Sequence, residues 1–517
     1  MRALTLKLAR DAWRTRAQVA SIGLVLAGGV LCVMAIRGAA SSLTRARDDY
    51  YRQAHFADVF ASLTRAPDEV ARRLAAVPGV AGVAARVVKD VRLDVPGLDR
   101  PATGRLISLP APGTDDDHID QVSVLRGRGI AAGSDEEVLV NGRFMEANHL
   151  SLGDTLTAVI NERRARLRIV GVGAAPDYLY EEAGGGMAVD ERSFAILWAP
   201  AALVTYATGM RGAFNDVALE LRAGARTAEV IGAVDSLLAR YGGRGAIARK
   251  DQLSHRVVQN ELQQLGVMGM AFPAFFVGVA AFLAGMVLTR LVATEREQIA
   301  VLKAFGYSNG AVARHYLAYA AIAVALGIVV GIALGTWLGR RFTSLYADIL
   351  RIPGLHFRID WGAMVIAMAV LSLATLAGAA RAAFRAARLA PAAGMQPPAP
   401  ARYGALLLDR LGFGDALPAA ARMVLRGLER HPARAVLGAT GVAAALGLMS
   451  GSLSLYDASR RMIDIQFRIG HREALAVHFI NAVPATARAS FAALPGVTHV
   501  ELTRMVPVRL HHAGHAR

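Results

Sequence analysis

Five long stretches of this sequence contain no Asp, Glu, Lys or Arg, and they limit the fold more than any other feature. They cover residues 17–36, 262–289, 316–339, 361–380 and 435–456. An α-helix needs roughly 20 apolar residues to cross about 30 Å of hydrocarbon, and each stretch is long enough. We therefore predict an α-helical membrane protein with five transmembrane helices. The second stretch is the longest and contains Pro273, so its helix should tilt, kink or project as a stalk.

The basic residues predict how these helices are oriented. The chain has 58 Lys and Arg against 41 Asp and Glu, a net charge of +17. Basic clusters lie before the first span, between the second and third, and after the fourth. If the spans alternate, all three clusters fall on one side, which places the N-terminus in the cytoplasm. The pair Arg340 and Arg341 follows the third span on the other side, and one such pair does not outweigh three clusters. The charge therefore indicates a multi-pass protein of the bacterial inner membrane, and we expect no nucleic-acid partner.

Residues 37–261 form a large polar insertion, for which we predict an extracytoplasmic α+β domain. A strand–helix–strand pattern opens the insertion and a second one closes it. Between them, residues 103–210 have the short strands and glycine turns of a β-rich insert. The predicted strands are 57–63, 83–93, 215–221 and 246–249, and the predicted helices are 67–76 and 227–241.

No residue of the chain is predicted to be catalytic, to bind a cofactor or to hold a metal. The acidic loop Asp115–His118 resembles a cation ligand set but is more typical of a solvated loop. Gly184–Gly186 lacks the following Lys of a phosphate-binding loop. The terminal His511, His512 and His515 have no predicted role, and Cys32, the single cysteine, excludes an internal disulfide.

The link between the second and third spans, residues 290–315, is predicted to contain a short amphipathic helix at the cytoplasmic face of the membrane. Ile299, Leu302 and Phe305 are spaced to share one helical face. Gly306 is a typical residue for ending such a helix, and Ser308 is a typical N-cap for the helix that becomes the third span.

This link closely resembles the signature of FtsX-like permeases, the membrane subunits of MacB-type ABC transporters. Residues 297–308 match the family pattern nearly position for position, with Lys303 in place of Arg and Phe305 in place of Leu. The glycine-rich third span and residues 388–397 also resemble the family, although Gly394 and Gln396 depart from its usual Ala and Arg. The resemblance covers roughly residues 1–400.

The resemblance implies a separate cytosolic ABC ATPase dimer that binds ATP and Mg²⁺, onto which the link helix docks as a coupling helix. This chain is not expected to be an enzyme, because none of its lysines follows a glycine as a P-loop requires. The alternative for Glu295 and Glu297 is ordinary solvation near Arg296. The coupling residues that the resemblance implies are Glu295, Arg296, Glu297, Ile299, Val301, Leu302, Lys303, Phe305 and Gly306.

The third span carries glycines at every fourth position, which form one smooth helical face that lets another helix approach closely. Two explanations stay open: packing within the chain, or contact between subunits. The glycines are Gly327, Gly331, Gly335 and Gly339.

Two functions are compatible with these features. In the first, the chain is the permease of an export complex for lipid, lipoprotein, peptide or drug, which transmits ATPase motion mechanically to the outer domain. Its further partners would be a periplasmic adaptor protein and membrane lipid. In the second, the same architecture is a signalling scaffold that activates a cell-wall hydrolase or a sensor kinase. The sequence leaves the substrate, the choice between export and signalling, and the oligomeric state open.

An internal repeat changes the expected domain organisation. Residues Leu74–Val80 recur 417 positions later as Phe491–Val497, and residues 91–93 recur as 508–510. The fifth span then repeats the first, and we predict the N-terminal portion of a duplicated, eight-span permease. A natural stop, a frameshift or an artificial boundary would each explain the end at residue 517. The predicted segments outside the spans are 1–16, 37–261, 290–315, 340–360 (an outer loop), 381–434 (a cytoplasmic linker) and 457–517 (the start of a second outer domain).

Overall fold

The computed structural model separates into two compact units, which we describe individually. The helical unit comprises Met1–Ser41, Leu265–Phe342 and Phe357–Ala476, and the β unit comprises Ser42–Gln264, Thr343–His356 and Val477–Arg517. The residues that the structure describes are 2–110, 118–180, 191–388, 390, 392, 395, 418, 428, 432–470, 472–477, 479, 483–504, 511–512 and 515–516.

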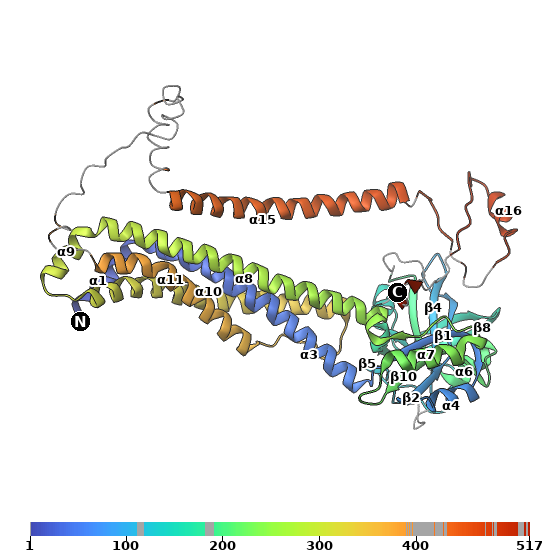
Figure 1. Cartoon of the computed structure of the whole chain (residues 1–517). Coiled ribbons are helices and arrows are strands. Elements are labelled where there is room, and N and C mark those ends of the chain that lie inside the picture. Colours follow the sequence, from blue (N-terminus) through green and yellow to red (C-terminus); the bar gives the residue numbers. More distant parts are fainter. Residues whose placement is uncertain are drawn as a thin grey trace. The chain divides into compact units, whose positions relative to one another are not determined.

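Long apolar helices build the helical unit. Within the described part of the chain, four helices are long and apolar enough to cross a membrane: Arg16–Gln53, Leu253–Thr294, Asn309–Leu350 and Trp361–Ala387. Figure 1 shows the corresponding α2, α8, α10 and α11 running side by side. This is a membrane protein, and these helices occupy four of the five predicted spans. The fifth predicted span lies in a helix, α15, and its membrane crossing stays a prediction. The helices are α1(Arg2–Arg14), α2(Arg16–Cys32), α3(Gly38–Gln53), α8(Leu253–Thr294), α9(Arg296–Ala304), α10(Asn309–Leu350), α11(Trp361–Ala387) and α15(Pro432–Asp464).

Three of these helices extend well beyond the predicted spans. The first continues from α2 through a π-helical turn, η1(Val33–Arg37), into α3. Helix α10 reaches Leu350, so residues 340–350 of the segment predicted as an outer loop are helical. Helix α8 is continuous through Pro273 for 42 residues. The predicted ends mark where charged residues begin, and a charge ends the membrane-crossing stretch without ending the helix.

The glycine face of the third predicted span packs inside the helical unit. A Cβ atom added at Gly331 would lie 2.6 Å from Cβ of Val30, and one added at Gly335 would lie 2.6 Å from Cβ of Met34. Gly327 lies in the same way against the backbone of Gly23 in α2. Only glycine permits this approach, which is the first of the two explanations offered by the sequence.

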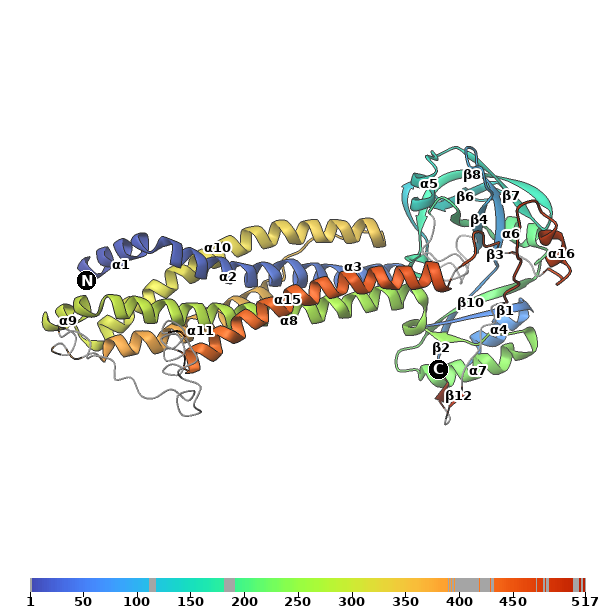
Figure 2. The same ribbon diagram turned by 90° about the horizontal axis from the view of Figure 1, so that it is seen from above.

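The two ends of the polar insertion form one sheet in the β unit. Its strand order is β11-β1-β10-β2, with all pairs antiparallel. Helices α4(Glu69–Ala75) and α7(Thr227–Leu238) cover one face (Figure 2). They bury Leu74, Val234 and Leu238 against the strands. The strands are β1(Val59–Pro67), β2(Val80–Arg86), β10(Ala213–Leu221) and β11(Ile247–Ala248).

The middle of the insertion folds into a second, seven-stranded sheet. Its order is β5-β8-β6-β9-β4-β3-β7, in which β4 and β9 pair in parallel, as do β6 and β8. The chain thus forms an α+β unit with a β-rich insert. The strands are β3(Val88–Asp94), β4(Ala102–Leu109), β5(Ser123–Gly127), β6(Glu137–Asn141), β7(Thr155–Ile160), β8(Arg163–Ala174) and β9(Phe194–Pro200).

Three predicted elements of this unit differ from the structure. The single strand predicted over 83–93 is two strands, β2 and β3, in different sheets. Pro67 ends β1 rather than starting the helix, and β11 is only two residues long. The break between β2 and β3 is the single residue Val87, whose N–H donates to Oγ of Ser108 at 2.8 Å. A one-residue break leaves the apolar alternation uninterrupted, so periodicity could not reveal it.

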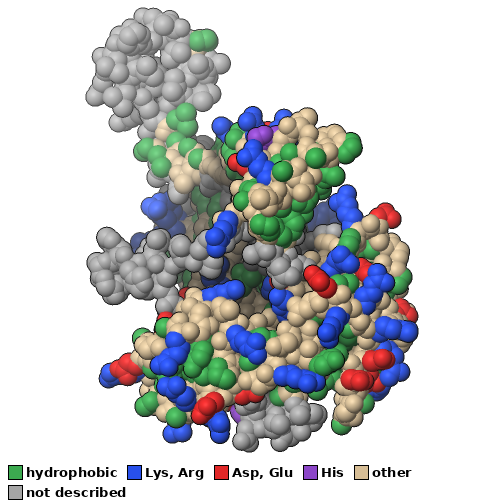
Figure 3. Space-filling model, turned by 90° about the vertical axis from the view of Figure 1, so that its right-hand side faces the viewer, with side chains coloured by type: hydrophobic (Ala, Val, Ile, Leu, Met, Phe, Trp, Pro, Cys, Tyr) green, Lys and Arg blue, Asp and Glu red, His purple; other side chains and the backbone are tan. Residues whose placement is uncertain are grey.

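The surface of the molecule carries charges of both signs. Figure 3 shows one face, on which Lys and Arg side chains are scattered among Asp, Glu and apolar side chains. A mixed surface of this kind is ordinary for a water-exposed domain.

Candidate functional site

Helix α9, the predicted coupling helix, is fixed at its C-terminal end by a Schellman motif. Gly306 adopts a φ of +89°. Its N–H donates to the carbonyl oxygen of Lys303 at 3.0 Å, and the N–H of Tyr307 donates to that of Leu302 at 3.2 Å. Oγ of Ser308 then accepts from the N–H of Ala311 at 3.2 Å as α10 begins. The predicted helix stop and N-cap are both confirmed, and the turn is tightly specified.

The buried face of α9 is not the one that the sequence predicts. Ile299 is 1% exposed, whereas Phe305 is 80% exposed. Leu302 is half-buried, and Nζ of Lys303 donates to the carbonyl oxygen of Ala387 at the end of α11, at 2.8 Å. The prediction of a common Ile299–Leu302–Phe305 face is therefore wrong. Phe305 is the C-cap residue, and the helical spacing no longer applies there.

The outward face of α9 combines apolar and acidic side chains. Val301 is 43% exposed, and Glu297 and Gln298 are also exposed. Glu297 and Val301 lie four residues apart, so they follow one line along the helix, and Phe305 is exposed at the C-cap. Arg296, at the start of the helix, is half-buried. The helix thus presents a narrow stripe that none of the described parts of the chain covers.

Glu295, the residue before α9, is held inside the helical unit. Its side chain is 13% exposed. Oε2 accepts from Nζ of Lys7 in α1 at 3.0 Å and from the hydroxyl of Tyr316 in α10 at 2.8 Å. Lys7 also lies 2.5 Å from Oδ2 of Asp11. The solvation alternative is therefore wrong for Glu295, which joins α1 and α10 to the entry of the coupling helix, whereas Glu297 is solvent-exposed.

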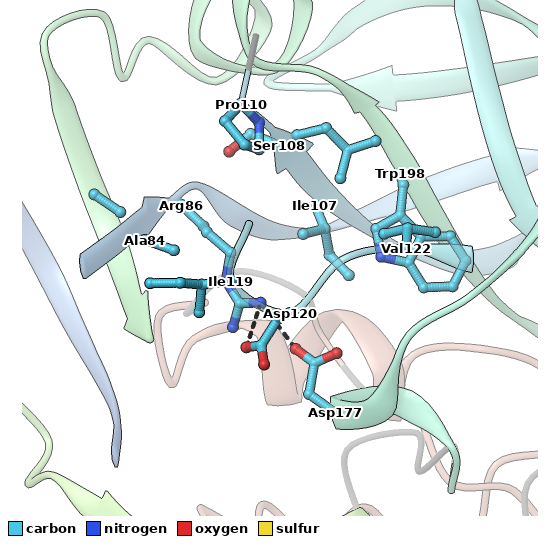
Figure 4. Close-up of a pocket in the computed structure, with 12 residues that line it drawn as sticks. Ala84, Arg86, Ile107, Ser108, Pro110, Ile119, Asp120, Val122, Asp177 and Trp198 are labelled. Atoms are coloured by element: carbon cyan, nitrogen blue, oxygen red, sulfur yellow. Dashed lines mark hydrogen bonds and ion pairs between the residues drawn. The ribbon is translucent and has the colours of Figure 1, made fainter. Parts of the chain in front are cut away.

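A second cluster of buried charges lies in the β unit around Arg86 of β2 (Figure 4). Its guanidinium lies 2.9 Å from Oδ2 of Asp177, 3.4 Å from Oδ2 of Asp120 and 2.7 Å from Oδ1 of Asp216. Asp216 is in β10 of the four-stranded sheet. Asp120 and Asp177 come from the insert, so Arg86 ties the insert to that sheet.

Burial decides the protonation of this cluster. It raises the pKa of Asp120 to about 7, because desolvation and the nearby Asp177 outweigh Arg86 and the backbone N–H of Ala57. Burial also raises the pKa of Asp177. Burial lowers the pKa of Arg86, but its three carboxylate neighbours reverse this effect and hold the guanidinium charged. The cluster can therefore keep a proton that an exposed carboxyl group would lose.

The other candidate residues have no comparable setting. Nε2 of His118 lies 3.4 Å from Oε2 of Glu220, next to His55. Among the described residues no group of three or more His, Cys, Asp or Glu is arranged to hold a metal. Residues 115–117 and 184–186 of the predicted loops, most of the 388–397 segment, and the side chains of the terminal histidines lie outside the described residues.

Sequence reasoning missed both charged clusters. The spacing of Lys7 and Asp11 is a readable i,i+4 pair on one helix. Their contact with Glu295, 288 positions from Lys7, carries no sequence signal. The same holds for Arg86 and Asp177, which are 91 positions apart.

The region that contains α9 matches a known family. Residues 270–391 match the model of the FtsX-like permease C-terminal domain. Residues 270–391 are an FtsX-like permease domain. The match covers most of α8 and all of α9, α10 and α11, and it confirms the family resemblance of the link motif. In this permease domain the outward stripe of α9 lies between two membrane-length helices.

Two solved structures are similar to part of the chain. The extracellular domain of the noncanonical ABC-type transporter YknZ from Gram-positive bacteria is 14% identical, with 37% of this chain and 98% of that chain covered and a TM-score of 0.25. The periplasmic region of MacB from Actinobacillus actinomycetemcomitans is 13% identical, with 39% of this chain and 92% of that chain covered and a TM-score of 0.26. No curated protein sequence matches this chain.

Proposed function

We propose that this chain is the permease subunit of an ABC export complex, in which a separate cytosolic ATPase dimer binds ATP and Mg²⁺ and docks on α9. The observation that carries the proposal is the position of α9 in the permease domain. It is a short helix between two membrane-length helices, anchored on one face and open on the other. The exported cargo would be a lipid, lipoprotein, peptide or drug, and a periplasmic adaptor protein would complete the complex.

The open stripe of α9 has the chemistry of a protein-docking surface. Phe305 and Val301 expose large apolar side chains, at 80% and 43%, next to the carboxylate of Glu297. Aromatic anchors with a charged neighbour commonly dominate the binding energy of protein interfaces. A groove on the ATPase that takes Phe305 and offers a cation to Glu297 would match this stripe.

The anchored face of α9 would carry the motion into the membrane. Ile299 packs in one core with Leu288 of α8 and Tyr316 of α10. Lys303 bonds to the end of α11, and Glu295 bonds to α1 and α10. Displacing α9 would therefore displace its neighbours together. Helix α8 is continuous over 42 residues, so a tilt at one end would be transmitted along its axis.

The docking step is tested by placing a charge on the apolar residues of the stripe. We expect Val301→Asp and Phe305→Asp each to reduce stimulation of the co-expressed ATPase by at least about tenfold, because each places a buried charge in the interface. Leu152→Asp is the matched control, since Leu152 is an exposed apolar residue of the β unit, at 41%. Unchanged ATPase stimulation and unchanged co-purification in both α9 variants would refute the docking role.

Export and signalling differ in what the assembled complex moves. Export predicts ATP-dependent loss of a lipid or small molecule from the purified complex, measured by mass spectrometry after reconstitution. A complex that activates a cell-wall hydrolase or a sensor kinase while moving no cargo would instead support the scaffold function.

A further inference from the structure

Helix α1 has an outward face that the coupling function does not use. Lys7 and Asp11 of α1 point inward, and Leu8 packs against the helical core. On the opposite side Leu6 is 69% exposed and Trp13 is 73% exposed. These two residues are seven positions apart, so they lie on the same face of the helix.

The charges on this outward face are all positive. Arg10 and Arg14 of α1 and Arg16, the first residue of α2, are exposed, and none of them forms an ion pair with the described residues. The guanidinium of Arg16 lies 5.3 Å from the centre of the Trp13 ring. Asp11 is the single acidic residue of α1, and its carboxylate is paired with Lys7. The face therefore combines two apolar anchors with three cations and no anion.

We propose that this face of α1 binds anionic phospholipid headgroups at the membrane surface. Helix α1 leads into α2 at Thr15, and α2 enters the membrane span from Arg16. The face is therefore continuous with the bilayer surface. Guanidinium groups form paired hydrogen bonds with phosphate oxygens, and Trp is favoured at the headgroup level. Leu6 and Trp13 would enter the boundary of the acyl chains while Arg10, Arg14 and Arg16 contact phosphates.

Lipid explains the composition of this face better than an acidic protein surface. An acidic groove would complement the arginines, but it would leave Leu6 and Trp13 against polar groups. The edge of an anionic bilayer satisfies both kinds of side chain at once, because phosphates lie directly above hydrocarbon. The inference does not depend on the proposed ABC assembly.

The first test locates Trp13 in the bilayer. The full chain is reconstituted in nanodiscs that contain phosphatidylglycerol brominated at shallow or deep acyl positions. Trp337 and Trp361 are also exposed, so the Trp13 signal is taken as the difference between the native chain and Trp13→Phe. We expect stronger quenching by shallow bromines, and stronger still when phosphatidylglycerol replaces phosphatidylcholine. A Trp13 signal that neither lipid quenches would overturn the proposal.

The second test removes the cations. The triple variant Arg10→Gln, Arg14→Gln, Arg16→Gln is compared with Arg65→Gln, Arg72→Gln, Arg73→Gln, which removes three exposed arginines of the β unit. Native mass spectrometry counts phosphatidylglycerol retained from mixed nanodiscs. Because each arginine near an anionic surface contributes about fivefold in affinity, we expect at least about a tenfold loss of retained lipid in the α1 variant alone. Equal retention in both variants overturns the proposal, as does loss of ATPase co-purification with lipid retention unchanged.

Discussion

Two segments of the β unit have nearly the same local structure and opposite environments. Residues 68–80 contain α4, and residues 485–497 contain α16(Ala487–Ala492). The N–H of Ala76 donates to the carbonyl oxygen of Arg72 at 3.2 Å. The N–H of Ala493, 417 positions later, donates to the carbonyl oxygen of Ala489 at 3.1 Å. Gly79 and Gly496 both have positive φ, at +95° and +85°. The repeated sequence thus forms the same helix and turn twice.

Burial separates the two segments. Val77 is 8% exposed and Val80 is 2% exposed, whereas the equivalent Leu494 and Val497 are 51% and 39% exposed. Helix α4 rests on the four-stranded sheet. Residues 483–504 are all described, and none of them is in a strand. The comparison shows that the Pro–Gly turn and the helix are specified locally, whereas the apolar face becomes a core only where strands cover it.

The shared backbone supports the hypothesis that the chain contains the start of a second copy. The N–H of Val80 donates to the carbonyl oxygen of Val77 at 3.1 Å, and the N–H of Val497 donates in the same way to the carbonyl oxygen of Leu494 at 3.2 Å. Sequencing the coding region downstream of residue 517 tests this hypothesis, because a second copy requires three further apolar spans in one reading frame.

The largest expected contrast between the segments is in their cores. We expect Leu74→Ala to destabilise the four-stranded sheet by about 3 kcal/mol, because it leaves a cavity at a fully buried site. Phe491→Ala, at the equivalent half-buried position, should cost less than about 1 kcal/mol. Hydrogen exchange of the full chain, read on peptides from β1 and α16, measures both effects. Similar losses at the two sites would contradict the difference in packing.

A second contrast is the charged cluster that follows α4. Arg86 ends β2, and the position 417 residues later is Thr503, so only the first copy carries this arginine. The pKa of Asp120 is about 7 in the folded protein against an ordinary value of 3.8. Between these values the folded state holds a proton that the unfolded state has released. The free energy of unfolding therefore falls as the pH rises from about 4 to 7, and it is constant above that range.

We expect a slope of up to about 1.4 kcal/mol per pH unit in this range, because the folded state holds one more proton, measured by thermal unfolding of the β unit in the full chain at a series of pH values. Asp120→Asn should reduce the slope, because the amide needs no proton and its oxygen can still accept from Ala57. Burial also raises the pKa of Asp177, which changes the free energy of unfolding in the same direction, so part of the slope should remain. Glu137 acts in the opposite direction, since its arginine partners lower its pKa to about 2, and its contribution is lost only below about pH 4.5. A variant with an undiminished slope would exclude Asp120 as the source.

The features that the sequence predicts correctly are those in which neighbouring residues decide the outcome. Gly306 ends α9, and Ser308 caps α10, because both act on backbone groups within three or four residues. The apolar spans are likewise a property of a continuous stretch. The ends of the helices are less predictable, as α10 shows, because Arg340 and Arg341 are as compatible with a helix as the residues before them.

The sequence predicts where the candidate site, α9, lies in the chain, but not which side of this helix is buried. The family motif locates α9 correctly. Which side is buried depends on α8, α10 and α11 together, and a nine-residue helix is too short for its periodicity to decide the question. Glu295 illustrates the difficulty, since its partner Lys7 is brought to it only by the packing of α1.

The smallest contrast is at the two turn glycines, and it separates backbone strain from crowding. Gly79 and Gly496 both have positive φ, so an alanine at either position should cost about 1 kcal/mol of backbone strain. A Cβ atom at Gly79 would also lie 3.0 Å from Cβ of Ala225 and 3.3 Å from Cγ2 of Val230, whereas one at Gly496 meets no atom within 4 Å. We therefore expect Gly79→Ala to cost about 2 kcal/mol and Gly496→Ala about 1 kcal/mol, measured from the exchange of the α4 and α16 peptides. Equal free-energy costs at the two glycines would mean that α7, which carries Val230, shifts to accept the methyl group. The packing around α4 would then add no constraint on the turn.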